Sequence, residues 1–374
     1  MLSLFCLSLH SQTLTKMKLV NVWRRLKASA TIVLRCLCRW KSIITYWVLT
    51  KQIKENKMFR AQILIILFLV LTGPTNAYAA QDTQIKSILV TGATTGLGRN
   101  LAETLASNGH HVYAGARTDQ EMAELNAIKN ITAVRLDVTK QDQIDAAVAF
   151  VKKQGTGLYG LVNNAGIGGG GPVLTTPVED QTSLYRVNVE GVYRVTKAFA
   201  PLVVESKGRI STTGSVAGTI TTSAYNAYSG SKHWIEAFTD GLALELASKD
   251  ISVSVIEPGN YQSHIRRNTV LSAFAKVEAM GGKITDEMQK QYEATAAYEL
   301  TLAKPDAVSA AFMHALFDTN PLRRYVVTPS QEERAFTIST KVKQLVELNQ
   351  WGPHNYSRNQ LVEMLDQAMA EKES

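Results

Sequence analysis

The chain has 374 residues, enough for one large domain or two, and 45% of them are hydrophobic, as in an ordinary globular protein. Its formal net charge of +8 comes from residues 1–57, which hold eleven Lys or Arg and a single acidic residue, so the later chain is close to neutral. A near-neutral remainder without a basic stripe excludes nucleic acid as its partner.

Residues 1–57 show no clean periodic pattern and contain all three cysteines, Cys6, Cys36 and Cys38. A disulfide framework and a zinc or other metal site built on cysteine are therefore excluded from the later chain. We interpret residues 1–57 as an upstream extension that is not part of the functional protein. A basic targeting or membrane-surface segment is the alternative.

Residues 58–79 have the layout of a secretory signal peptide. Arg60 supplies the positive start, residues 63–71 form an apolar run, and a small-x-small cleavage site ends at Ala79. Cleavage there would leave residues 80–374. An uncleaved membrane anchor is the alternative, although the apolar run is short for a span. The sequence thus predicts an exported or membrane-anchored protein, and a cytoplasmic one only if this segment is not a signal.

Short apolar runs and amphipathic patterns alternate from residue 86 onward. The predicted strands are residues 87–90, 112–116, 131–136, 158–162, 209–213, 251–256 and 324–327. The predicted helices are residues 97–108, 119–128, 140–153, 180–205, 225–248 and 305–318. This alternation predicts an α/β fold, a Rossmann-type doubly wound parallel sheet of about seven strands with helices on both faces. We assign residues 80–330 to this domain and residues 331–374 to a C-terminal helical extension.

A glycine-rich turn joins the first predicted strand to the first predicted helix. The turn reads Thr91-Gly92-Ala93-Thr94-Thr95-Gly96-Leu97-Gly98. Glycines let the backbone turn tightly and approach a pyrophosphate, and the helix that follows offers free N–H groups to the anion. A turn of this kind is often only a connection, so the motifs further along the chain decide its meaning.

Tyr228 and Lys232 lie four residues apart on a predicted helix, so their side chains share one face. A free tyrosine, with a pKa of about 10, is a poor base at neutral pH. A nearby ammonium and the positive charge of an oxidised nicotinamide would lower that pKa. Tyr228 could then exchange a proton with an alcohol or carbonyl oxygen while a hydride moves to or from the cofactor. A surface Tyr and Lys on an amphipathic helix is the alternative.

The glycine turn, Asn-Asn-Ala-Gly at residues 163–166, Ser215 and Tyr228-x3-Lys232 stand in a fixed order along the chain. In this order they resemble the short-chain dehydrogenase/reductase family, over about residues 85–330. The resemblance implies that Ser215 hydrogen-bonds the substrate oxygen, that Lys232 also binds the nicotinamide ribose, and that Asn188 completes the catalytic set by holding a water.

The same resemblance implies a set of cofactor-binding residues and no metal ligand. These residues are Thr91, Gly92, Thr94, Thr95, Gly96, Leu97, Gly98, Arg117, Asp137, Val138, Asn164, Ala165, Gly166, Tyr228, Lys232, Pro258, Gly259 and Ser263. Asp137 would meet the adenine amino group, although an aspartate at this point can also be a turn or cap residue. Ser263 falls where many relatives bind the carboxamide.

Two positions bear on the branch of the family. Gly214 stands where family members often carry a second serine, a mild departure that leaves the Ser215 hydroxyl in place. Glu257, before Pro258 and Gly259, resembles the retinol- and hydroxysteroid-dehydrogenase branches.

Arg117, at the end of the second predicted strand, favours NADP(H) over NAD(H). A carboxylate there would hold the ribose hydroxyls of NAD, whereas a guanidinium is a planar, permanently charged fork suited to a 2′-phosphate. The basic residue that some NADP-users carry inside the glycine turn is absent, because Thr95 occupies that place.

The sequence thus predicts an NADP(H)-dependent oxidoreductase that acts on a small or lipophilic carbonyl or alcohol substrate. Residues 264–303 are the expected substrate-side insertion. An idle cofactor-binding scaffold or redox sensor is the alternative, and an extended-branch sugar-nucleotide epimerase is a third, disfavoured by its glycine spacing. The family implies a homodimer or homotetramer built on helices 180–205 and 225–248, and residues 1–79 offer a possible membrane contact.

Overall fold

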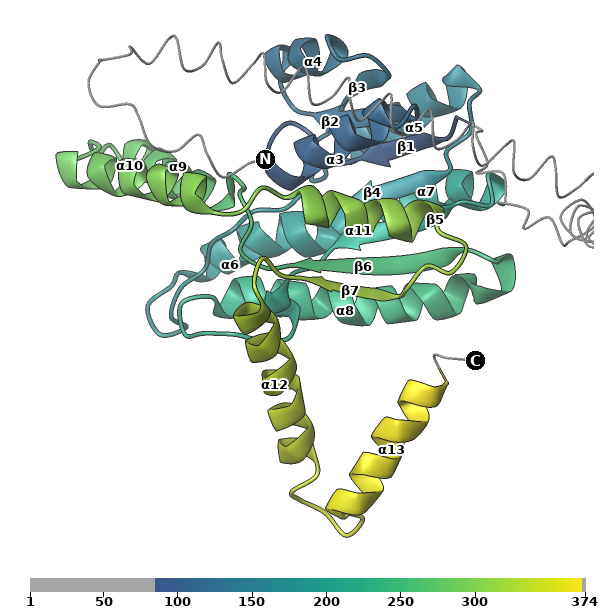
Figure 1. Cartoon of the computed structure of the whole chain (residues 1–374). Helices are drawn as coiled ribbons and strands as arrows, with labels where there is room; N and C mark the ends of the chain where they lie inside the picture. Colours follow the sequence, from purple (N-terminus) through teal and green to yellow (C-terminus); the bar gives the residue numbers. More distant parts are fainter. Residues whose placement is uncertain (1–84, 372–374) are drawn as a thin grey trace, which may run out of the picture. The chain divides into compact units, whose positions relative to one another are not determined.

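The computed structural model describes residues 85–371, which fall in one compact unit (Figure 1). The basic extension, the signal-like segment and the three cysteines lie outside the described residues. Across residues 85–371, none of the helices combines the length and the apolar character needed to cross a bilayer.

Seven parallel strands form one sheet in the order β3-β2-β1-β4-β5-β6-β7. Their bounds are β1 Ser87–Val90, β2 His111–Ala116, β3 Ile131–Arg135, β4 Gly160–Asn163, β5 Arg209–Thr213, β6 Ser252–Pro258 and β7 Arg324–Val327. The predicted doubly wound sheet is therefore confirmed. The order of strands reverses between β1 and β4, and ligands bind such sheets at the carboxyl ends of the strands beside this point.

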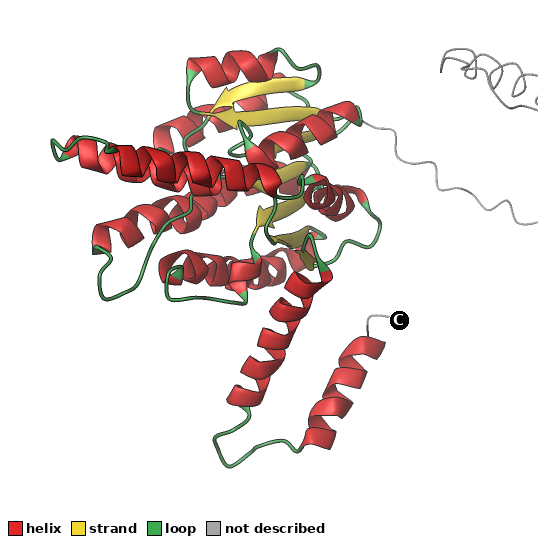
Figure 2. Ribbon diagram, turned by 60° about the vertical axis from the view of Figure 1, so that its left-hand side comes forward, coloured by secondary structure: helices red, strands yellow, loops and turns green. Residues whose placement is uncertain are grey.

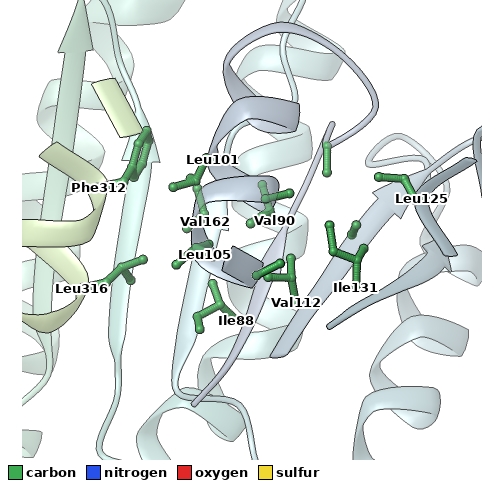
Figure 3. Close-up of a cluster of buried hydrophobic side chains, with 14 of the residues drawn as sticks. Ile88, Val90, Leu101, Leu105, Val112, Leu125, Ile131, Val162, Phe312 and Leu316 are labelled. Atoms are coloured by element: carbon green, nitrogen blue, oxygen red, sulfur yellow. The ribbon is translucent and has the colours of Figure 1, made fainter. Parts of the chain in front are cut away.

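Helices cover both faces of the sheet (Figures 1 and 2). One face carries α3 Gly96–Ser107, α4 Asp119–Asn126 and α11 Asp306–Phe317, and the other carries α5 Gln141–Gln154, α7 Val192–Glu205 and α8 Asn226–Leu246. Strand β1 alternates between the two cores: Ile88 and Val90 pack in the cluster with α3 and α11, and Leu89 packs in the other. Figure 3 shows the first cluster. Burial on both faces is what makes the strand read as a continuous apolar run.

The predicted helix 180–205 is interrupted. It consists of α6 Val178–Tyr185, a π-helical segment Arg186–Gly191, and α7. Within the segment, the Asn188 side chain pairs with the backbone of Ile167, accepting from its N–H at 2.9 Å and donating to its C=O at 3.0 Å. Helical periodicity does not reveal this wider turn, because it comes from a contact with a distant loop.

The fourth strand begins two residues later than predicted. Leu158 is fully buried, like a strand residue. Its backbone N–H, however, donates to Ser206 Oγ at 3.0 Å and not to a neighbouring strand. The apolar run predicts burial correctly but not the hydrogen-bond partner.

Two helical pairs lie outside the sheet layers. The predicted insertion 264–303 forms α9 Ile265–Ala279 and α10 Asp286–Thr301. Glu299, 1% exposed on α10, holds the start of α9 through an ion pair with Arg267 at 2.6 Å and a hydrogen bond from the Arg266 N–H at 3.0 Å. The C-terminal pair is α12 Gln331–Leu348 and α13 Arg358–Ala370, which extend away from the sheet (Figure 1).

We predict that Gly98→Ala destabilises the fold. A Cβ at Gly98 would lie 2.3 Å from both Asn164 Nδ2 and the Gly92 carbonyl oxygen, so the turn or β4 must shift. Overpacking of this kind costs about 2 kcal/mol, which a urea unfolding curve would measure. Gly241→Ala is the matched control, because no atom lies within 4 Å of its added Cβ and alanine favours a helix. Equal midpoints for the two variants would contradict the prediction.

Candidate functional site

The ends of β1 and β4 are locked together by hydrogen bonds. Thr91 Oγ1 accepts from the backbone N–H groups of Asn164 at 2.9 Å and Ala165 at 3.0 Å. Asn164 Nδ2 in turn donates to the carbonyl oxygens of Thr91 and Gly92 at 3.0 and 3.1 Å. Thr213 Oγ1, at the end of β5, donates to Asn164 Oδ1 at 3.1 Å. The glycine turn and the Asn-Asn-Ala-Gly segment are thus held side by side at the switch point.

The glycine turn forms a backbone cradle. Gly92 and Gly96 have φ angles of +61° and +56°, which side chains rarely adopt, and a Cβ at Gly92 would lie 2.8 Å from the Cα of Ala165. Helix α3 begins at Gly96, and the Thr95 side chain makes no capping hydrogen bond there. The first N–H groups of α3 are therefore not capped by this side chain, and such groups at a helix start suit a pyrophosphate. Ser263 lies close by, since a Cβ at Gly96 would be 3.4 Å from the Cβ of Ser263.

The ends of β2 and β3 place Arg117 and Asp137 within electrostatic reach of each other. Asp137 Oδ1 accepts from the N–H and the hydroxyl of Thr139 at 2.9 and 2.7 Å. Burial acts to raise the pKa of Asp137, but these hydrogen bonds and the charge of Arg117 outweigh it and lower the pKa. Asp137 is therefore a turn residue and an ionised carboxylate at once, and the Arg117 side chain beside it is exposed.

Asn188 and Val138 lie behind the switch point. Asn188 is 2% exposed, and besides Ile167 its Nδ2 donates to Ser231 Oγ at 3.2 Å. Ser231 lies on α8, and its hydroxyl donates to the carbonyl oxygen of Tyr228 at 2.7 Å. Val138 packs on the same segment, because a Cβ at Gly191 would lie 2.6 Å from Val138 Cγ2. The Asn188 amide is thus engaged in holding the loop after β4 against α8.

Ser215, Tyr228 and Lys232 meet at the carboxyl ends of β5 and β6. Ser215 Oγ accepts from the N–H of Ala217 at 3.1 Å and donates to the Pro258 carbonyl oxygen at 3.5 Å, and it is near enough to Tyr228 to influence the pKa of the phenol. Lys232 Nζ donates to the Thr213 carbonyl oxygen at 2.8 Å and lies 5.7 Å from the centre of the Tyr228 ring. The predicted spacing therefore brings a hydroxyl, a phenol and an amine together.

Burial dominates the electrostatics of this group. It raises the pKa of Tyr228, and the opposing effects of the Ser215 hydroxyl and the Arg266 charge do not cancel it. Burial also lowers the pKa of Lys232 to about 8, although the charge of Glu236 opposes it. The lowered phenol pKa expected from the sequence is thus not a property of the chain alone. It needs the further positive charge that an oxidised nicotinamide carries.

Three residues of this site have no counterpart in the sequence motifs. Thr213 holds both Asn164 and Lys232, and Glu236 follows Lys232 by one helical turn, a spacing that could have indicated it. Arg266, at the start of α9, donates to Asn260 Oδ1 at 2.5 Å. No local pattern indicates Arg266, because its place near Tyr228 depends on how the insertion folds back.

Comparisons with known proteins agree with this geometry. Residues 86–273 match the family model described as short chain dehydrogenase. Bovine mitochondrial D-beta-hydroxybutyrate dehydrogenase is 31% identical over 275 residues, 67% of this chain and 79% of that protein. Rat retinol dehydrogenase 16 is 32% identical over 257 residues, 65% of this chain and 80% of that protein. The closed form of serine dehydrogenase complexed with NADP+ is 27% identical, with a TM-score of 0.55 over 64% of this chain and 94% of that one.

A parallel sheet with a glycine cradle at its switch point defines a dinucleotide-binding α/β protein. The chain belongs to the short-chain dehydrogenase family, in its retinol and hydroxysteroid dehydrogenase-like branch. It is an oxidoreductase that acts on CH–OH groups.

We predict that Lys232→Met stabilises the folded protein near pH 7. Lys232 is 7% exposed, and lowering its pKa from 10.5 to about 8 costs about 3 kcal/mol at neutral pH. The lost hydrogen bond to Thr213 offsets part of this, which leaves a gain of about 1–2 kcal/mol. The free-energy cost of the buried ammonium is present in full below about pH 8 and disappears as the pH rises to 10.5. The difference in unfolding free energy between the variant and the wild type therefore shrinks across that range. Urea unfolding at pH 7 and 9.5 checks this, and a variant less stable at pH 7 would contradict it.

Proposed function

We propose that this protein transfers a hydride between NADP(H) and a carbonyl or secondary alcohol substrate, with Tyr228 as the general acid and base. The observation that carries the proposal is the meeting of Ser215, Tyr228 and Lys232 beside the glycine cradle. Bound nicotinamide would supply or accept the hydride.

The residues of the chain divide the remaining work. In the reducing direction the phenol of Tyr228 donates its proton to the carbonyl oxygen, and the hydroxyl of Ser215 holds that oxygen. The Lys232 ammonium, fixed by its hydrogen bond to Thr213, stabilises the phenolate that remains and binds the ribose hydroxyls. In the oxidising direction the Tyr228 phenolate takes the proton from the alcohol, whose oxygen Ser215 holds.

The preference for NADP(H) is supported by Arg117, an exposed guanidinium at the end of β2. The serine dehydrogenase with a similar fold is complexed with NADP+. The remaining cofactor residues proposed from the sequence lie at the carboxyl ends of the strands: Thr91–Gly98 after β1, Asp137 and Val138 after β3, Asn164–Gly166 after β4, and Pro258, Gly259 and Ser263 at the end of β6.

The substrate would enter beside α9 and α10, and a small or lipophilic ketone, aldehyde, retinoid or steroid is the first candidate. Arg266 favours a second candidate, a small oxo or hydroxy acid. Its guanidinium lies 5.5 Å from the Tyr298 ring and is close enough to Tyr228 to influence its pKa. A carboxylate is the natural ligand of such a group, and the bovine relative is named for hydroxybutyrate.

We further propose a homodimer or homotetramer formed through α7 and α8, as is usual in the family. We also propose export or membrane anchoring through the segment before residue 80. Because dinucleotides are scarce outside the cytosol, this location requires a compartment that supplies NADPH. An idle cofactor-binding scaffold is the rival function, and turnover decides between the two.

The cofactor preference predicts a selective loss in Arg117→Ala. Removing a fork that binds the 2′-phosphate should weaken NADPH binding by about tenfold and leave NADH binding unchanged. Fluorescence titration of both cofactors measures this. Lys140→Ala, which removes a nearby positive charge, is the control and should leave the ratio of the two affinities as it is. An equal loss for both cofactors in Arg117→Ala would overturn the preference.

The mechanism predicts that Tyr228→Phe abolishes turnover and retains NADPH binding, because only the transferable proton is removed. The assay follows NADPH and then NADH oxidation by residues 80–374 with ketones, aldehydes, retinoids, steroids and acetoacetate. Loss of at least about a thousandfold in rate is expected. Binding without turnover by the unaltered protein across the whole panel would favour the scaffold, and undiminished turnover by the variant would refute the mechanism.

A further inference from the structure

The C-terminal helix α12 contacts the turn that follows β6. Glu333, half-buried in the first turn of α12, accepts a hydrogen bond at Oε1 from the Asn260 backbone N–H at 2.9 Å. Its carboxyl group lies directly against the turn, because a Cβ at Gly259 would be 2.8 Å from Glu333 Cδ. On its other side, Arg334 Nη1 donates to the Val326 carbonyl oxygen on β7 at 2.9 Å. The start of α12 thus joins the edge of the sheet to the turn.

The Glu333 side chain is used differently from those at the same position of two other helices. Glu333 is the third residue of α12, and the Oγ of the N-cap residue Ser330 accepts from its N–H at 3.2 Å. In α4 and α13 the third residue, Glu121 or Gln360, closes a capping box by bonding back to the N-cap backbone. The Glu333 carboxylate bonds to Asn260, 73 residues away in the sequence. Its contact is therefore one between elements of the fold.

A second hydrogen bond connects α12 to the turn that carries the candidate catalytic serine. Gln344 Nε2 donates to the carbonyl oxygen of Thr219 at 3.0 Å. Thr219 ends the short 3-10 turn that starts at Ser215, where the Gly218 N–H donates to the Ser215 carbonyl oxygen at 2.8 Å. Ser215 Oγ reaches the Pro258 carbonyl oxygen at 3.5 Å. Helix α12 therefore spans two turns of the site that also contact each other.

The turn after β6 leads into the substrate-side insertion. Asn260 Oδ1 accepts from Arg266 Nη2 at 2.5 Å, at the start of α9. Ser263, three residues after Asn260, has its Cβ 3.4 Å from the position of a Cβ built at Gly96 in the glycine turn. A displacement of this turn would therefore move groups on both the cofactor side and the substrate side of the site.

We propose that Glu333 is a positioning residue, which holds the turn after β6 in place for the nicotinamide end of the cofactor. Pro258, Gly259 and Ser263, the cofactor residues proposed at this end, lie on or next to that turn. Glu333 touches neither cofactor nor substrate and acts through the Asn260 backbone, so the C-terminal extension is a working part of the active site. The effect on the cofactor rests on the proposed function, whereas the hold of Glu333 on the turn does not.

The first test needs no cofactor. Hydrogen exchange followed by mass spectrometry reports on the backbone of residues 259–264 in the intact protein. Glu333→Ala removes the acceptor of the Asn260 N–H, so that amide should exchange about fivefold faster. Glu347→Ala is the matched control, because it removes the same charge from an exposed position in the last turn of α12 and should leave the rate unchanged. An unchanged rate in Glu333→Ala would overturn the proposal.

The second test compares NADPH with 2′-phospho-ADP-ribose, which has the same adenine half and pyrophosphate but lacks the nicotinamide. In titration calorimetry, Glu333→Ala should weaken NADPH binding by about fivefold and leave the affinity for 2′-phospho-ADP-ribose unchanged, because only the nicotinamide end meets the turn after β6. Glu333→Gln should restore most of the NADPH affinity, since its amide oxygen still accepts from the Asn260 N–H. Glu347→Ala should bind both ligands like the wild type.

The pair of ligands separates a displaced turn from a general loss of structure. A loosened fold would weaken both ligands in Glu333→Ala, and this result would refute the proposal, as would an NADPH affinity equal to that of the wild type. If only NADH binds, NADH and ADP-ribose replace the pair. If neither NADPH nor NADH binds the wild type, the proposed function fails, and hydrogen exchange still decides whether Glu333 holds the turn.

Discussion

The hydrogen-bonded junction between the ends of β1 and β4 is the constraint on which the site depends. The Thr91 hydroxyl and the Asn164 amide satisfy backbone groups of two strands that diverge at this point. Without these bonds, buried backbone groups would lack partners, which the folded state does not tolerate. The same bonds hold the glycine turn beside the Asn-Asn-Ala-Gly segment, and Thr213 extends this junction to β5. The position of the cradle therefore follows from the way the sheet reverses.

The position of Lys232 serves the proposed chemistry but lowers the stability of the folded protein. A lysine in solvent would keep its ordinary pKa but could not lie beside Tyr228 within the fold. Burial places it there and brings its pKa close to neutrality, where small changes in nearby charge decide its protonation. The hydrogen bond to Thr213 fixes the amine, and the charge of Glu236 opposes the effect of burial on its pKa.

The sequence predicts those features that depend on local pattern. The strands appear as apolar runs because both faces of a parallel sheet are covered, and the glycine turn is visible because Gly92 and Gly96 need positive φ angles. The π-helical segment, the link from Asn188 to Ile167, and the ion pair of Glu236 with Arg324 depend on segments that are apart in the chain. No window of sequence contains them, since each becomes a contact only after the sheet and α8 have formed.

The one departure from the family pattern near the site, Gly214 before Ser215, has a physical reason in this chain. A Cβ at this position would lie 2.6 Å from Val255 Cγ2 and 3.4 Å from Glu236 Oε1. The contact with the Val255 methyl group is the one that a side chain could not keep, whereas the distance to Glu236 Oε1 is an ordinary contact. A serine at this position would therefore have to displace the side chain of Val255 on β6. The glycine thus lets the turn of the candidate catalytic serine pack directly on the sheet.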